Sequence, residues 1–318
     1  MTKSIYIKDI KAGDKVSTAF LVAEKNMACS QKGAPYLNLK LKDRTGEVDA
    51  KVWDNAPQWD PVFGKGDIVH CQARAVSYKN ALQLSILEIR RLEAGDVDPA
   101  DFFPCARRDP EAMFAELEGL VASVTAPHLK ALLAAFFADA EVVGAFKRAP
   151  AAKGFHHVYI GGLLEHTLSV VRLLDVASRH YDGLDRDLLL VGGILHDIGK
   201  IREYRYEGLI DYSDEGRLIG HIVIGVEMLD EKIATLAAFP PETAMALRHI
   251  LLSHHGEMEF GSPKRPKTLE AMIVHQLDDL DAKVNAIQGF VAGTPDDASA
   301  WTPFHRLFGR FLYKGKPG

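Results

Sequence analysis

The sequence predicts a multi-domain α+β protein in which an N-terminal five-stranded β-barrel precedes an all-α domain. In the first 93 residues, apolar and polar side chains alternate over short runs, which is typical of strands with one buried face. From about residue 111 onward, apolar side chains recur at helical spacing. A stretch rich in Pro, Asp and Gly, "LEAGDVDPADFFPCARRDP", separates the two patterns. We therefore predict domains at 1–93 and 111–318, joined by a linker at 94–110.

The strands are expected to be joined by short turns. In "YLNLKLKDRTGEVDAKVWD" every second residue is apolar on both sides of "KDRTGE", which predicts a hairpin. Further strand-like runs are "DKVSTAFLVAEKN", "DIVHCQARAVSYKN" and "ALQLSILEIRRL". Five short strands in roughly 80 residues predict a small closed or partly closed barrel.

Helices are predicted for the rest of the chain. "DPEAMFAELEGLVASV" and "PHLKALLAAFFADAEVVGAFKRA" have helical spacing, and each opens at a proline start signal. Further helices are expected at about 158–180, 185–199, 216–235, 240–254 and 267–289, followed by a less regular tail.

The composition is typical of a soluble globular protein, with 47% hydrophobic and 25% charged residues. The three cysteines lie far apart and form no CxxC pair, which argues against a disulfide framework and a thiolate zinc site. The N-terminus has no signal-peptide apolar region, and apolar runs such as 188–195 are too short to span a bilayer. We therefore predict a soluble, cytoplasmic protein without a membrane partner.

Charge is distributed unevenly along the chain. Residues 1–93 carry 15 Lys and Arg against 11 Asp and Glu, whereas the remainder carries 23 against 32. The basic N-terminal segment favours binding of a polyanion. In the acidic remainder, some carboxylates would be cation ligands, although solvated helix faces account for most acidic residues.

Metal-ligand side chains recur beside apolar helix faces. Ten of the thirteen histidines fall between 156 and 275. A buried polar group without a partner costs about 2 kcal/mol or more, so several such groups aimed at one point favour a shared divalent cation. The contexts are "GGLLEHTLSVVRLL" with His166, "LLLVGGILHD" with His196 and Asp197, "GRLIGHIVIGVEML" with His221, and "MIVHQLDDLDAKV" with Asp278.

A lone histidine on an apolar face is more often a hydrogen-bonded core residue than a ligand, and we expect this of His249 and His275. The pair His196-Asp197 is different, because Gly199 and Lys200 follow it at once. Gly199 is expected to relax the helix end. Lys200 adds a cation to a site already rich in metal ligands, which indicates that an anion, most simply a phosphate, binds there.

The ordered set His166, His196-Asp197 and Asp278 resembles the H…HD…D signature of the HD superfamily of metal-dependent phosphohydrolases, in which "HDIGK" is a common central motif. The chain also resembles the YhaM-type 3′-to-5′ exoribonucleases over nearly its whole length. The resemblance lies in "KGAPYLNLKLKDRTGEVDAKVWD", "GGLLEHTLSVV" and "LDDLDAK". It implies an OB-type barrel followed by an all-α HD domain.

The resemblance also implies a metal centre. His166, His196, Asp197 and Asp278 would be ligands, with Asp197 bridging two ions. A second ion would be held by His221, His254 and His255 together with Asp197. Two alternatives stay open: the domain binds a single ion, or only one histidine of the "SHHG" pair is a ligand. Imidazole with carboxylate suits Mn²⁺, Fe²⁺, Co²⁺, Ni²⁺ or Zn²⁺ better than Mg²⁺, and the resemblance favours manganese.

The implied activity is that of a metal-dependent 3′-5′ exonuclease. It would hydrolyse single-stranded RNA to nucleoside monophosphates by metal-activated water, with single-stranded DNA and a homo-oligomeric state left open. Asp197 and Lys200 are the catalytic candidates, because Lys200 would absorb charge that develops on the phosphoryl oxygens.

The barrel carries a mixture of aromatic and basic side chains that suits single-stranded nucleic acid. Bases stack on aromatic rings and phosphates pair with lysines, so we take Tyr36, Lys40, Trp53 and Tyr78 as candidate contacts. The alternative is structural, because strand aromatics are usually core residues and lysines usually protect strand edges.

Two other functions stay open from the sequence. One is an HD-type phosphohydrolase of small nucleotides with a regulatory or oligomerising barrel. Its cyclic-dinucleotide form is disfavoured, because "HHGE" is followed by "MEFGSPKRP" rather than by "GYP". The other is a binding protein that retains a metal for structure.

Overall fold

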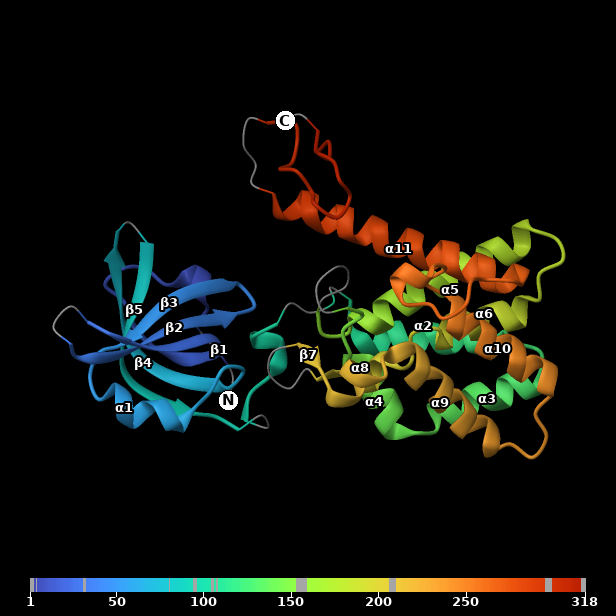
Figure 1. The fold of residues 1–318 in the computed structure, drawn as a ribbon, viewed down its shortest axis with the longest axis horizontal. Helices are drawn as coiled ribbons and strands as arrows, with labels where there is room; N and C mark the ends of the chain where they lie inside the picture. The colour runs from blue at the N-terminus through green and yellow to red at the C-terminus, as the bar shows by residue number, and fades with distance from the viewer. Residues whose placement is uncertain are drawn as a thin grey trace. The chain divides into compact units, whose positions relative to one another are not determined.

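The computed structural model describes residues 3, 5–30, 33–79, 81–93, 96–103, 106, 108–152, 159–205, 210–294 and 299–315 (Figure 1). His156 and His157 of the predicted histidine cluster lie outside these residues. The chain divides into two compact units. The first comprises Met1–Cys105 with Arg205–Asp211, and the second comprises Ala106–Tyr204 with Tyr212–Gly318. The predicted boundaries at 93 and 110 stay a prediction.

The first unit contains the predicted five-stranded barrel, which is closed in the order β1-β2-β3-β5-β4. Only β3 and β5 run parallel, and the other neighbours are antiparallel. The elements are η1 (Ile7–Asp9), β1 (Lys15–Cys29), β2 (Pro35–Asp43), β3 (Gly46–Val52), α1 (Ala56–Trp59), η2 (Asp60–Val62), β4 (Ile68–Tyr78), β5 (Ala81–Arg91) and η4 (Pro99–Asp101).

Alternation along the strands fills this barrel. Leu37, Leu39 and Leu41 of β2 are buried in its core, whereas the residues between them face outward. β1 is long enough to pair with β4 through its first half and with β2 through its second half. A register shift between Val22 and Glu24 lies at the change of partner, where a bulge bends the strand and helps the sheet to close.

The second unit is helical, as predicted. Within it α5 packs on α6 and α11, and α10 packs on α6, α9 and α11. Its helices are α2 (Pro110–Ala122), α3 (Pro127–Phe137), α4 (Ala140–Arg148), α5 (Gly162–His180), α6 (Arg186–Leu195), α7 (Lys200–Glu203), α8 (Asp214–Leu218), α9 (His221–Ala234), α10 (Pro241–Ser253), η5 (Met258–Phe260) and α11 (Leu269–Gly293). The short strands β6 (Tyr204–Arg205) and β7 (Asp211–Tyr212) form a separate two-stranded sheet.

Three helix predictions need correction. The pattern from Pro127 contains two helices, because the Asp139 side chain accepts hydrogen bonds from Glu141 N and Val142 N and so starts α4. The helix predicted at 185–199 ends at Leu195, and a turn follows. The helix predicted at 216–235 is interrupted by Gly220, whose φ of 81° lies outside the helical region.

Among the described helices, none combines the length and the apolar content that a membrane crossing needs.

Candidate metal centre

His196 and Asp197 lie in the turn that joins α6 to α7, and both side chains are almost fully buried. The backbone N–H of Lys200 donates to the carbonyl of Asp197 at 3.0 Å, which closes this turn. Asp197 therefore points into the helical unit from a fixed backbone position, and metal-ligand side chains surround it on both sides.

The first group of side chains faces Oδ2 of Asp197. Nε2 of His166, from α5, lies 3.6 Å from this oxygen, and Nε2 of His196 lies 3.4 Å from it. Asp278, from α11, places Oδ1 3.1 Å from His166 Nε2 and 3.7 Å from His196 Nε2. Four side chains from three parts of the chain thus converge on one point, which we call the first cluster.

The second group faces the other oxygen of the same carboxylate. Oδ1 of Asp197 lies 3.5 Å from Nε2 of His221, at the start of α9, and 3.4 Å from Nε2 of His254, which follows α10. Asp197, His221, His254 and His255 each offer a ligand atom within 4.8 Å of all the others. We call these four residues the second cluster, and Asp197 belongs to both clusters.

Each imidazole is held through its Nδ1 atom. Nδ1 of His196, His254 and His255 lies 2.7 to 2.8 Å from the backbone carbonyls of Gly193, Leu251 and Phe260, respectively. A carbonyl oxygen only accepts, so Nδ1 carries a proton, and Nε2 is the ring atom that can offer a lone pair to a cation. This arrangement is typical of metal-bound histidines.

Two carboxylates that the sequence analysis missed support the other imidazoles. Asp281 Oδ2 lies 2.8 Å from Nδ1 of His166, and Glu203 Oε1 lies 2.9 Å from Nδ1 of His221. Asp281 stands one turn after Asp278 in "LDDLDAK", a stretch whose acidic residues could equally have formed a solvated face. The sequence signal for Asp281 was its position one helical turn after the candidate ligand Asp278.

Buried polar atoms without hydrogen-bond partners indicate that the second cluster can hold a cation. In the described part of the chain, Asp197 Oδ1, His221 Nε2 and His254 Nε2 are buried without a hydrogen-bond partner. Three acceptors that face one another in the interior repel unless a cation or a proton lies between them. An imidazole and carboxylate donor set of this kind suits a divalent transition metal.

The ionisation states also suit a cation. Burial alone would raise the pKa of Asp197, but the positive charge of Lys200 and the interactions with the neighbouring His196 imidazole outweigh it and hold this pKa well below its usual range. Burial lowers the pKa of His254 and of His221, which keeps both rings neutral and able to coordinate. Lys200 places Nζ 2.6 Å from Oδ2 of Asp197 and is itself buried.

Gly199 has a different role from the one expected. Its φ of −62° is helical, so the residue does not relax the chain. A Cβ atom there would lie 2.0 Å from the carbonyl oxygen of His221 and 2.7 Å from the nitrogen of Gly225. Glycine is therefore required because α9 approaches the turn closely, and this approach brings His221 to Asp197.

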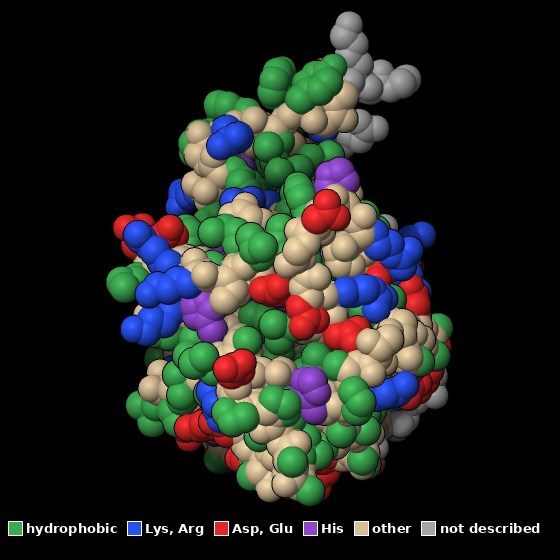
Figure 2. All heavy atoms as spheres, turned by 90° about the vertical axis from the view of Figure 1, so that its right-hand side faces the viewer, with side chains coloured by type: hydrophobic (Ala, Val, Ile, Leu, Met, Phe, Trp, Pro, Cys, Tyr) green, Lys and Arg blue, Asp and Glu red, His purple; other side chains and the backbone are tan. Residues whose placement is uncertain are grey.

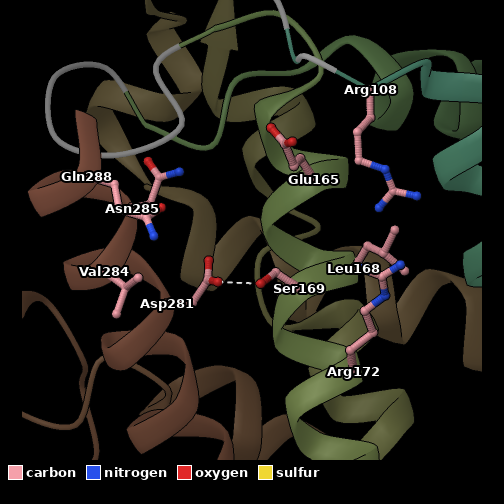
Figure 3. Close-up of a pocket in the computed structure, with 9 residues that line it drawn as sticks. All are labelled: Arg108, Glu165, Leu168, Ser169, Arg172, Asp281, Val284, Asn285 and Gln288. Atoms are coloured by element: carbon pink, nitrogen blue, oxygen red, sulfur yellow. Dashed lines mark hydrogen bonds between the residues drawn. The ribbon is translucent and has the colours of Figure 1, made fainter. Parts of the chain in front are cut away.

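A cavity of about 350 Å³ lies between α5 and α11 next to the first cluster (Figure 3). Ser169 and Asp281 face each other in it, and the Ser169 hydroxyl donates to Oδ1 of Asp281. Because the other oxygen of Asp281 binds His166, this cavity reaches the group that orients a candidate ligand.

The two histidines that we expected to be structural have backbone partners. Nε2 of His249 accepts from the N–H of Lys267 at 2.9 Å. Nδ1 of His275 lies 2.8 Å from the carbonyl of His254 and so steadies the backbone of the second cluster.

The barrel brings the three aromatic candidates together. Ring centroids of Tyr36 and Trp53 lie 4.7 Å apart, and Lys51 Nζ lies 4.9 Å from each centroid and 5.9 Å from that of Tyr78. Trp53 and Tyr78 are 45% and 54% exposed, so these rings are not core residues. Lys40 lies further along β2, with Nζ 4.0 Å from Oε2 of Glu47.

Two family models match separate parts of the chain. An HD domain model matches residues 163–283, and an OB-fold nucleic acid binding domain model matches residues 19–92. The barrel is also similar to the second OB-fold domain of replication protein A from Methanococcus maripaludis. That likeness is weak, at 20% identity and a TM-score of 0.24, and it covers 29% of this chain and 96% of that one.

Curated relatives match most of the chain. Proteins named 3′-5′ exoribonuclease YhaM from Shouchella clausii and Listeria monocytogenes are each 36% identical to it. They match over 285 and 282 residues, which is 88% and 87% of this chain and 87% and 88% of theirs. A relative of the same name from a Geobacillus species is 35% identical over 278 residues, or 87% of this chain and 85% of its own. The chain belongs to the YhaM family. The resemblance drawn from the sequence is therefore confirmed, as is the predicted fold.

The clusters lie within the part of this YhaM-family chain that the HD model matches. The matched range, 163–283, includes His166, His196, Asp197 and Asp278 together with the residues of the second cluster. HD domains bind divalent metals, and the geometry gives this domain two groups of side chains able to do so.

Proposed function

We propose that this chain is a metal-dependent exonuclease that degrades single-stranded RNA from the 3′ end and releases nucleoside monophosphates. Membership of the YhaM family supports the reaction and its direction. The observation that carries the proposal is the position of Asp197, whose two oxygens face two separate imidazole groups.

In this proposal His166, His196, Asp197 and Asp278 hold one ion, and Asp197, His221, His254 and His255 hold another. Two divalent ions sharing a carboxylate would supply Lewis acidity toward a phosphodiester and lower the pKa of a bound water. The mixed nitrogen and oxygen donors disfavour Mg²⁺, and we assign Mn²⁺ to both sites on the strength of the family resemblance. Fe²⁺, Co²⁺, Ni²⁺ and Zn²⁺ are the competitors for the same donors.

The protein's own groups then perform three tasks. Asp197 fixes the spacing of the two sites because its carboxylate belongs to both. The Nδ1 hydrogen bonds of the histidines hold the rings in their coordinating tautomer. Lys200, whose Nζ lies 2.6 Å from Oδ2 of Asp197, would stabilise the negative charge that develops on the phosphoryl oxygens during the displacement.

The barrel would hold the strand. Tyr36, Trp53 and Tyr78 surround Lys51 on an exposed face, which combines stacking surfaces with a positive charge. Lys40 would contact the strand further along β2. Joining such a face to a hydrolase raises the concentration of strand ends near the metals. We keep the division into 1–93, a linker at 94–110 and 111–318 as part of the proposal, and we place the enzyme in the cytoplasm.

The test is a digestion with products resolved at single-nucleotide steps. Single-stranded RNA labelled at the 5′ end is incubated with the protein and Mn²⁺, in parallel with DNA of the same sequence. We expect a ladder that shortens from the 3′ end, with mononucleotides as the other product. Faster turnover of free nucleotides than of oligonucleotides would instead favour the small-nucleotide phosphohydrolase.

A further inference from the structure

The chain ends in a small hairpin that the metal centre does not use. Residues 299–315 form two short antiparallel segments, with isolated bridges that pair Trp301 with Tyr313 and His305 with Arg310. Backbone bonds from Thr302 N to Leu312 O and from Lys314 N to Ala300 O tie the segments together. The His305 ring contacts Phe290 near the end of α11, with centroids 4.4 Å apart. The hairpin therefore has a defined place on the helical unit.

This hairpin exposes four aromatic rings. Trp301, Phe304, Phe311 and Tyr313 are each between 50% and 59% exposed. Trp301 packs edge-on with Tyr313, with centroids 5.2 Å apart, and Phe304 packs edge-on with Phe311 at 5.4 Å. Edge-on pairs hold the rings in place and leave ring faces open. In Figure 2 apolar side chains dominate the segment that projects at the top of the molecule.

The charge of the hairpin has one sign. Residues 299–315 contain Arg306, Arg310 and Lys314 and neither Asp nor Glu, although the whole chain has a net charge of −5. Arg306 and Arg310 are exposed. Single-stranded nucleic acid matches both features, because its phosphates would pair with the cations and its bases would stack on the aromatic rings.

We propose that the hairpin at 299–315 binds single-stranded RNA upstream of the 3′ end that enters the metal centre. The inference rests on the proposed function for its substrate class. Phe290 follows Asp278 by twelve positions along α11, which corresponds to about 18 Å along the helix axis. A strand with its 3′ end at the clusters therefore reaches the hairpin only after several nucleotides, and a dinucleotide cannot reach it.

A second copy of the chain is the competing occupant of an exposed aromatic surface. If two copies associated through their hairpins, Arg306, Arg310 and Lys314 of one copy would approach the same three residues of the other. The like charges oppose that contact, whereas phosphates neutralise them. Charge complementarity therefore favours RNA.

The experiment measures RNA affinity and short-substrate turnover in the full chain. Binding of an oligouridylate of about 20 nucleotides, longer than the roughly 4–16 that one OB fold covers, is measured with chelator present so that the strand stays intact. We expect Trp301→Ala/Phe311→Ala to weaken binding about tenfold or more, since each lost stacking partner is worth roughly 5- to 150-fold. Trp301→Phe/Phe311→Tyr should restore it. Tyr181→Ala/Met245→Ala removes two side chains that are 55% and 65% exposed elsewhere on the helical unit, and serves as the matched control.

A charge reversal tests the phosphate contact separately. Arg306→Glu should reduce the slope of log Kd against log salt by about 0.7 or more, the value for one phosphate contact on a single strand. Lys130→Glu, at an exposed position of α3, should leave the slope unchanged. Dinucleotide hydrolysis with Mn²⁺ should be equal to that of the unaltered chain in every hairpin variant.

Unchanged RNA affinity in Trp301→Ala/Phe311→Ala would overturn the inference. A dimeric unaltered chain and a monomeric variant with the same RNA affinity would also overturn it, because the hairpin would then bind a second copy. Failure of the proposed function looks different. In that case the unaltered chain hydrolyses no dinucleotide, while the hairpin variants still lose RNA affinity.

Discussion

Oδ2 of Asp281 lies 2.8 Å from Nδ1 of His166, so a carboxylate outside both clusters orients a proposed ligand. Removing such a support typically costs 10- to 100-fold in metal affinity. We predict that Asp281→Ala weakens Mn²⁺ binding by about that factor, and that excess metal restores turnover. Isothermal titration with Mn²⁺ measures the affinity directly.

The matched control is Asp279→Ala on the same helix. Asp279 is half-exposed and pairs with Lys283 at 2.6 Å, away from the imidazoles. Its loss should leave the affinity for Mn²⁺ unchanged. Equal affinities for the two variants would show that Asp281 does not support His166.

The close approach of α9 to the His196–Gly199 turn gives a second prediction. In Gly199→Ala, the added methyl group meets the carbonyl oxygen of His221 at 2.0 Å, so α9 must move. We expect the free energy of unfolding to fall by about 1–3 kcal/mol and the second cluster to lose affinity for metal. Gly289→Ala on α11, where nothing lies within 4 Å, should instead stabilise the helix by about 0.5–1 kcal/mol. Denaturant titration of both variants provides the comparison.

The ionisation of His166 gives a third prediction, for chelated protein. Burial by itself lowers the pKa of His166, but hydrogen bonds with Asp278 and Asp281 outweigh it and raise this pKa to about 9. The pKa of an unfolded histidine is about 6.5, so the folded state holds this proton more tightly. The resulting stability is fully present below pH 6.5 and is lost as the pH rises through about 9.

Chemical denaturation in the presence of chelator should therefore show a falling free energy of unfolding from pH 6.5 to 9. Asp281→Ala removes one cause of the raised pKa and should make the fall smaller. A flat profile in the unaltered chain over this range would contradict the arrangement around His166.

The sequence predicted the barrel and the ligand types better than it predicted their arrangement. Alternation along β2 was enough to place Leu37, Leu39 and Leu41 inside, because burial on one face of a strand has a period of two. The position of the helix break at Asp139 was missed because apolar spacing continues across it. The role of Gly199 could not be read from its neighbours, since the atom that excludes a side chain belongs to His221 on another helix.

The grouping of the histidines into two sets was implied by the family resemblance and not by the residues themselves. The family resemblance suggested that Asp197 bridges two ions, but the assignment of each imidazole to one oxygen depends on how α5, α9 and α10 pack. Glu203 has no motif of its own and becomes visible only through its contacts with His221 N and Nδ1, both 2.9 Å.

The most direct test of the shared carboxylate is the number of Mn²⁺ ions bound per chain, measured by elemental analysis with turnover of RNA in the same samples. We predict two ions in the unaltered chain, one in His254→Ala, and loss of both sites and of turnover in Asp197→Ala, with RNA binding within a few fold. An Asp197→Ala protein that retains two ions and degrades RNA would contradict the account.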